Sequence, residues 1–129
     1  DGDARHIVPV DVKNAGKVGG VQFELVFDSD LLEAVEVRPG DGARGATFDY
    51  RLDTEGRIAV AVVKMSGFES EGSLAEVVFR PAADSPEAEV ALVNVRAYDK
   101  SLLPLSPTIT SGRCSPGKTA SPAVIDFLD

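Results

Sequence analysis

The stretch VQFELVF, residues 21–27, decides the fold because its apolar and polar side chains alternate. Its odd-numbered residues are all apolar, whereas Gln22 and Glu24 fall between them. A period of two is typical of a β-strand with one buried face. The turn-forming stretch NAGKVGG (14–20) precedes it and Asp28-Ser29-Asp30 follows it. We therefore expect a strand bounded by a turn at each end.

The same alternation recurs along the chain on both sides of this strand. Turn signals such as PGDG (39–42) and TEG (54–56) separate the alternating stretches. No stretch has a convincing helical period. We therefore predict an all-β fold, a two-sheet β-sandwich of about nine short strands. Besides residues 21–27, the expected strands include residues 8–12, 31–38, 48–52, 58–62, 75–79 and 89–98.

Three irregularities in the alternating pattern lead to further predictions. Pro9 predicts that the first strand lies at a sheet edge, because proline cannot donate to a ladder of hydrogen bonds. Residues 89–98 change phase, which predicts a β-bulge near Leu92. Residues 102–110 are interrupted by proline and are expected to form an edge strand at best.

The composition fits one acidic domain. The chain has 129 residues and a formal net charge of -8, with a pI near 4.6. Nucleic acid and anionic membranes would repel such a surface. The single cysteine, Cys114, cannot close an internal disulfide. No apolar run approaches the roughly 20 residues that span a bilayer, so we expect no membrane insertion, and the start DGDARH lacks signal-peptide character.

Two glycine-rich motifs are expected to be accidental. Residues 112–119 (GRCSPGKT) fit the phosphate-loop pattern, but Pro122 interrupts the helix that such a loop must open. Residues 40–45 (GDGARG) fit a dinucleotide-binding pattern, but a strand follows where a helix is needed. We therefore predict no small-molecule substrate.

Catalytic and metal-binding patterns are weak as well. His6 is the only histidine, and Cys114 has no nearby base in the sequence. A glycosidase-like pair of catalytic carboxylates stays an open alternative, because a chain with 21 acidic residues always contains some pair. We predict no catalytic residue, no metal and no intrinsic cofactor. Two acidic groups lack the loop of an EF-hand and are expected to be turn carboxylates: Asp28 with Asp30, and Asp49 with Asp53 and Glu55.

The order of these features resembles the cohesin family. The resemblance covers roughly residues 5–110 and implies a jelly-roll sandwich whose exposed sheet face binds a dockerin, a small helical module that holds calcium. It also implies an extracellular or cell-surface scaffold, as in cellulosomes that assemble enzymes for polysaccharide breakdown. The resembling segments are IVPVDVKN (7–14), GKVGGVQFELVFDSDLLEAVEVRPGD (16–41), Phe48, GRIAVAV (56–62), Ser66-Gly67 and GSLAEVVF (72–79).

The alternation and the resemblance together predict where a partner binds. If Ile58, Val60 and Val62 face the core, the side chains between and after them face outward as a flat apolar strip, which suits a docked helix. Small residues lining a covered strand are the competing interpretation. The predicted partner-binding residues are Gly20, Gln22, Glu24, Ala59, Ala61, Val63, Lys64 and Gly67.

The end of the chain departs from the family pattern. Residues 111–115, where the closing strand is expected, read SGRCS instead of a β-branched run. We therefore assign the cohesin-like sandwich to residues 1–115. Residues 116–129 are expected to be a linker-like tail or an additional terminal strand.

The alternative function is a carbohydrate-binding or adhesive sandwich. Such modules usually stack sugars on exposed aromatic rings, and this chain has two Tyr, six Phe and no Trp. Tyr50 and Tyr98 are the residues on which sugar binding would depend. We predict a protein–protein interaction module and not an enzyme.

Overall fold

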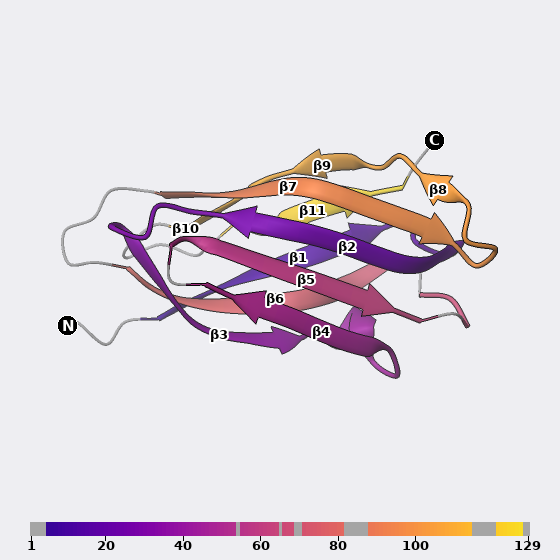
Figure 1. Cartoon of the computed structure of the whole chain (residues 1–129), viewed down its shortest axis with the longest axis horizontal. Coiled ribbons are helices and arrows are strands. Elements are labelled where there is room, and N and C mark those ends of the chain that lie inside the picture. Colours follow the sequence, from indigo (N-terminus) through magenta and orange to yellow (C-terminus); the bar gives the residue numbers. More distant parts are fainter. Residues whose placement is uncertain are drawn as a thin grey trace.

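The strands with alternating apolar side chains form two β-sheets that face each other across one hydrophobic core (Figure 1). The computed structural model describes residues 5–53, 55–64, 66–68, 71–81, 88–114 and 121–127. Its architecture is the all-β jelly-roll sandwich that the sequence predicts. Within the described ranges, no helix has the length and hydropathy to cross a bilayer.

The first sheet contains β1 (His6–Lys13), β3 (Leu32–Pro39), β6 (Glu71–Pro81), β9 (Thr108–Thr110) and β11 (Ala123–Asp126). Their order across the sheet is β3-β6-β1-β11-β9. Strands β1 and β11 run parallel, whereas the other pairs are antiparallel.

The second sheet contains β2 (Val18–Val26), β4 (Thr47–Leu52), β5 (Arg57–Val63), β7 (Ala88–Asp99) and β10 (Gly112–Cys114). Their order is β10-β7-β2-β5-β4, and the short β8 (Pro104–Leu105) pairs with β7. The 3-10 turn η1 (Asp41–Ala43) lies between β3 and β4. In Figure 1 this second sheet forms the front layer.

The core is built from the inward side chains of both sheets. Phe23 of β2 is paired with Val60 of β5, and both are buried. Phe27, just after β2, meets Phe79 of β6 edge to face, with ring centroids 5.0 Å apart. Such a contact is worth about 0.5–1.5 kcal/mol beyond the area that it buries. It ties the two layers together near one end of the sandwich.

The β4–β5 hairpin follows the prediction. The Asp53 carboxylate accepts hydrogen bonds from the backbone N–H groups of Glu55 and Arg57, at 2.9 and 3.1 Å. Gly56 has a φ of +93°, and a Cβ there would collide with the Phe27 carbonyl oxygen. The backbone N–H of Phe27 donates to the Gly56 carbonyl at 2.9 Å. The turn is therefore held against the end of β2, which fixes the register of β5.

One local prediction is wrong and another is confirmed. Pro9 does not mark an edge strand, because β1 lies between β6 and β11. The β11 ladder begins only at Val10, one residue after the proline, so Pro9 needs no partner on that side. The bulge predicted near Leu92 is confirmed, because the β7 register shifts between Val93 and Arg96 and Asn94 adopts a φ of +53° there.

The remaining sequence motifs take simple structural forms. Gly112–Cys114 is a strand paired with β7, and the rest of the phosphate-loop-like motif, residues 115–119, lies outside the described residues. Residues 40–45 contain η1 and turns. Cys114 is fully buried, and burial raises the pKa of its thiol. Strand β9, within residues 102–110, lies at the edge of its sheet as predicted.

Strand β11 completes the first sheet with residues from the end of the chain. It inserts between β1 and β9, and its Ile125 is completely buried in the core. The short β10 borders β7 in the other sheet, and Arg113 and Ser121 form a bridge between their backbones. The segment that ends the chain therefore contributes core side chains.

Replacing Ile125 with Ala should lower the free energy of unfolding by about 2–5 kcal/mol, because it removes a side chain from a closed core. Urea unfolding followed by circular dichroism measures this. The matched control is Ile7→Ala, since Ile7 lies on the neighbouring β1 and is 44% exposed. The control should cost about 1 kcal/mol or less. Equal losses in the two variants would show that β11 is not part of the core.

Candidate partner-binding face

The side chains on the outward surface of strands β4, β5, β2 and β7 form one continuous face, which we call the outer face. The backbone pairing arranges it in three rows across the strands. In the order β4, β5, β2, β7, these rows are Thr47, Val63, Gly20, Tyr98; then Asp49, Ala61, Gln22, Arg96; then Arg51, Ala59, Glu24, Val93.

The alternation of β5 has the predicted orientation. Ile58, Val60 and Val62 are buried, whereas Ala59 and Ala61 are half-buried on the outside. Val63 is 41% exposed. The competing interpretation, in which another element covers the small residues, is wrong within the described part of the chain.

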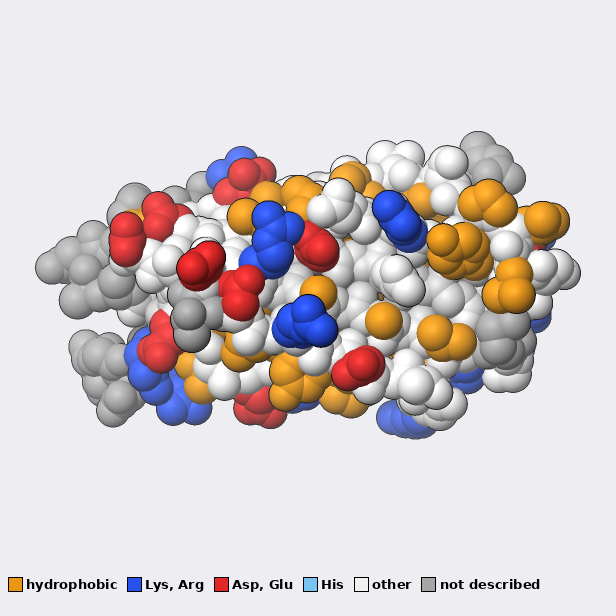
Figure 2. All heavy atoms as spheres, viewed as in Figure 1, with side chains coloured by type: hydrophobic (Ala, Val, Ile, Leu, Met, Phe, Trp, Pro, Cys, Tyr) orange, Lys and Arg blue, Asp and Glu red, His pale blue; other side chains and the backbone are white. Residues whose placement is uncertain are grey.

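The middle of the outer face is a shallow, open hollow of about 640 Å³. Its floor includes Ala59, Ala61 and Gln22, and Arg51 and Arg96 stand on its two sides. Figure 2, which shows this face, has blue and red side chains interleaved with small hydrophobic patches in the middle. Small side chains on the floor leave room for another molecule to approach the sheet closely.

A charged cluster crosses one end of this hollow. Arg57 of β5 forms an ion pair with Glu24 of β2, and the side-chain amide of Asn94 donates to the same carboxylate at 3.0 Å. The hydrogen bond from Asn94 is the largest cause that holds the pKa of Glu24 below its ordinary value, and Arg57 acts in the same direction against partial desolvation. Because Asn94 sits at the β7 bulge, that irregularity places the amide over β2.

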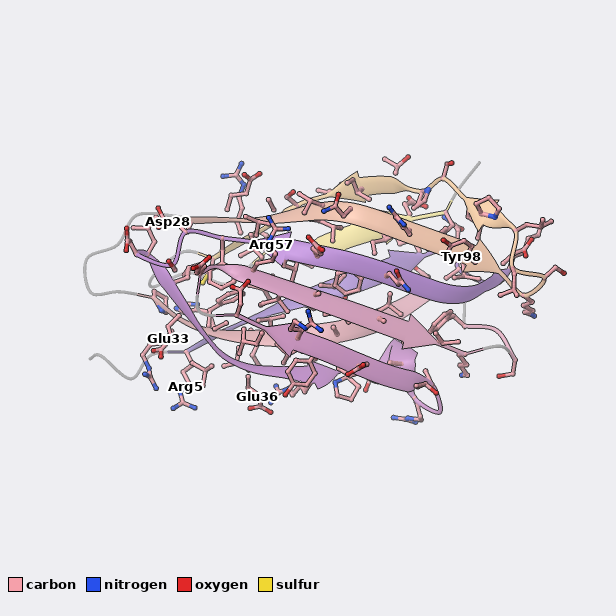
Figure 3. The ribbon with its side chains drawn as sticks, viewed as in Figure 1. Arg5, Asp28, Glu33, Glu36, Arg57 and Tyr98 are labelled. Atoms are coloured by element: carbon pink, nitrogen blue, oxygen red, sulfur yellow. The ribbon has the colours of Figure 1, made fainter. Side chains whose placement is uncertain are left out.

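The opposite end of the outer face is more hydrophobic. A Cβ at Gly20 would lie 3.8 Å from Val63 Cγ2, so these two residues adjoin across β2 and β5. Figure 3 shows Tyr98 near the end of β7, and Arg57 lies toward the opposite end of the sheet. Large hydrophobic patches appear at this end in Figure 2.

The loop after β7 continues this hydrophobic end. The Asp99 carboxylate accepts hydrogen bonds from the backbone N–H groups of Ser101 and Leu103, at 2.8 and 3.0 Å. The loop is thereby fixed with Leu102 68% exposed and Leu103 61% exposed. These two neighbouring leucines add exposed apolar surface beside β7.

Two of the predicted residues lie outside the three rows of the outer face. Lys64 follows β5 and lines a second, smaller depression with Asp41, Gly42 and Arg44 of the η1 region. Gly67, with a φ of +98°, packs against the side chain of Lys100. The other six predicted residues, Gly20, Gln22, Glu24, Ala59, Ala61 and Val63, are brought together on the outer face.

Sequence reasoning missed Arg51, Arg96, Asn94 and the exposed leucines. The alternation of residues 47–53 was visible and put Asp49 and Arg51 on one side of their strand. The sequence does not show which strands are neighbours in the sheet. Only the sheet order places β4 and β7 on either side of β5 and β2.

Acidic side chains in the turns hold the local backbone through hydrogen bonds. Asp28 accepts a hydrogen bond from the N–H of Asp30 at 2.9 Å, and Asp53 closes the β4–β5 turn. Among the residues that the structure describes, no three His, Cys, Asp or Glu side chains are grouped so that they could hold a metal ion.

A jelly-roll sandwich with one open, slightly hollowed sheet face is the class of protein defined by this geometry. The chain belongs to the cohesin family, because the family model for the cohesin domain matches residues 7–115. No curated protein sequence matches the chain.

Solved structures share the fold. One similar structure is a non-cellulosomal cohesin from the archaeon Archaeoglobus fulgidus, with 24% identity, coverage of 98% of this chain and 81% of that chain, and a TM-score of 0.73. A type I cohesin–dockerin complex from Clostridium thermocellum gives 18% identity, 95% and 89% coverage, and a TM-score of 0.70. The cohesin module of a family 33 glycoside hydrolase from Clostridium perfringens gives 11%, 95% and 96%, and 0.65. At these identities the likeness establishes the fold alone.

Replacing Asn94 with Ala should raise the pKa of Glu24 toward its ordinary value, because the main hydrogen bond to the carboxylate is lost. A carboxylate with a lowered pKa stabilises the fold above its ordinary pKa, and that contribution is lost as the pH falls through the lowered value. The variant should therefore lose part of this pH dependence. Side-chain carbon NMR of Glu24 across the acid range measures the shift.

The matched control is Asn14→Ala, because Asn14 donates to Asp126 at 2.9 Å, in the other sheet. Glu24 should titrate in this control as in the parent chain. An unchanged Glu24 titration in the Asn94 variant would contradict the assigned cause.

Proposed function

We propose that this chain is a binding module that docks a dockerin-like partner on its outer face and thereby attaches an enzyme or surface protein to an extracellular scaffold. The observation that carries the proposal is the outward strip Ala59, Ala61 and Val63, bordered by Gly20 and Gln22 and covered by no described element. Calcium would belong to the partner dockerin.

The outer face has the dimensions of a docking surface. Four strands about 4.8 Å apart span about 14 Å between the outermost backbones. The seven residues of β5 extend over about 23 Å at 3.3 Å per residue. A helix of three to four turns, about 16–22 Å long, fits within this area.

Family membership supports the same conclusion. The chain is a member of the cohesin family, and a similar solved structure is a cohesin in complex with a dockerin. Another is a cohesin module of a glycoside hydrolase, which agrees with attachment of carbohydrate-active enzymes. We propose that the module itself contributes binding and no catalysis.

The aromatic residues favour protein binding over sugar binding. Tyr98 projects from the outer face, whereas Tyr50 is paired with the buried Val60 and emerges on the opposite side of the sheet at its edge. The two rings therefore cannot form one stacking platform. All six phenylalanines are buried or half-buried: Phe23, Phe27, Phe48, Phe68, Phe79 and Phe127.

Replacing Ala61 with Arg should weaken dockerin binding at least about 30-fold, the size of a hot spot of about 2 kcal/mol. The long charged side chain would fill the hollow and hold a docked helix away from the sheet. Isothermal titration calorimetry against a panel of recombinant dockerins measures the loss. Thermal melting should be unchanged, because residue 61 points outward.

The matched control is Thr110→Arg, which adds the same side chain at an exposed position of β9 in the other sheet. It should bind like the parent chain. If both arginine variants bind equally well, the outer face is not the docking surface.

A further inference from the structure

The side chains of two arginines on the outer face have no partner among the residues that the structure describes. Arg51 of β4 and Arg96 of β7 are both exposed. Their guanidinium groups make no hydrogen bond or ion pair with any residue that the structure describes. Arg57, by contrast, is paired with Glu24.

These two arginines stand on opposite sides of the hollow. Arg96 shares a row with Gln22 and Ala61, and Arg51 shares the adjacent row with Ala59 and Glu24. Strands β4 and β7 are separated by three strand spacings, or about 14 Å. A helix is about 10–12 Å across with its side chains, so one helix lying along β5 and β2 would have an arginine on each flank.

The outer face is less acidic than the chain as a whole. The chain carries a formal net charge of -8. In the three rows, however, the two arginines Arg51 and Arg96 balance the two carboxylates Asp49 and Glu24, and Glu24 already accepts hydrogen bonds from Arg57 and Asn94. Asp49, the other carboxylate, lies beside Arg51 on β4 and accepts the N–H of Tyr50 at 2.9 Å.

We propose that the partner segment bound in the hollow is a helix with acidic side chains on both flanks, and that Arg51 and Arg96 determine this specificity. The inference rests on the proposed function and names the chemistry of the partner. A guanidinium group binds a carboxylate through two parallel hydrogen bonds, which gives both attraction and orientation. A basic helix would be repelled by both arginines.

The test uses a panel of recombinant dockerins graded by the charge on their exposed helices. The most acidic members should bind the parent chain best, and their affinity should fall with added salt. Arg51→Glu and Arg96→Glu should each weaken that binding 10-fold or more, measured by calorimetry. Arg51→Gln and Arg96→Gln, which remove the charge without reversing it, should have smaller effects in the same direction.

The matched control is Arg5→Glu, which makes the same charge change at an exposed residue before β1 (Figure 3). It should bind like the parent chain. Replacing the acidic residues on both flanks of the best dockerin helix with Lys should abolish binding to the parent chain and restore it to a double variant that carries Arg51→Glu and Arg96→Glu.

The outcomes separate the two proposals. If the parent chain binds dockerins but the arginine variants bind equally well, the acidic-helix inference is overturned and the docking function stands. If no dockerin binds the parent chain, both are overturned. Binding of an acidic polysaccharide such as polygalacturonate, lost in the arginine variants while dockerin binding is kept, would also overturn the inference.

Discussion

The pairing of β2 with β5 is the interaction on which the rest of the structure depends. Val21, Phe23 and Leu25 face inward opposite Val62, Val60 and Ile58, and all six side chains are buried. Because side chains alternate along a strand, this register also fixes which residues face outward. A slip of one residue would place alanines in the core and valines on the surface. The core and the outer face are therefore two consequences of one register.

Much of this arrangement could be predicted because it is encoded locally. Period-two alternation identified the strands and the outward direction of Ala59 and Ala61, and a resemblance spread over many positions indicated the family. The sequence alone did not show which distant segments pair with each other in a sheet. Pro9 looked like an edge residue because nothing in residues 1–13 shows that β11 pairs beside it, starting one residue later. Arg51 and Arg96 are 45 positions apart and come to flank one hollow only through the order of four strands.

The outer face combines features that a stable isolated sheet does not need. Alanines in the middle of β5 bury less apolar surface than valines would, and two arginines stand without partners in the described structure. The Glu24, Arg57 and Asn94 cluster, by contrast, satisfies its own charges and limits one end of the hollow. At the other end, the Asp99 carboxylate holds a loop that exposes Leu102 and Leu103. A docked helix would meet an apolar end, a small-residue floor and cationic flanks.

Hydrogen–deuterium exchange of the chain with and without a bound dockerin tests this account most directly, since every element is observed in one experiment. Slower exchange on binding should be concentrated in β5, β2 and the adjoining parts of β4 and β7. The first sheet, including β1, β3 and β6, should exchange as in the free chain. Protection confined to that first sheet, with the outer face unchanged, would contradict the account.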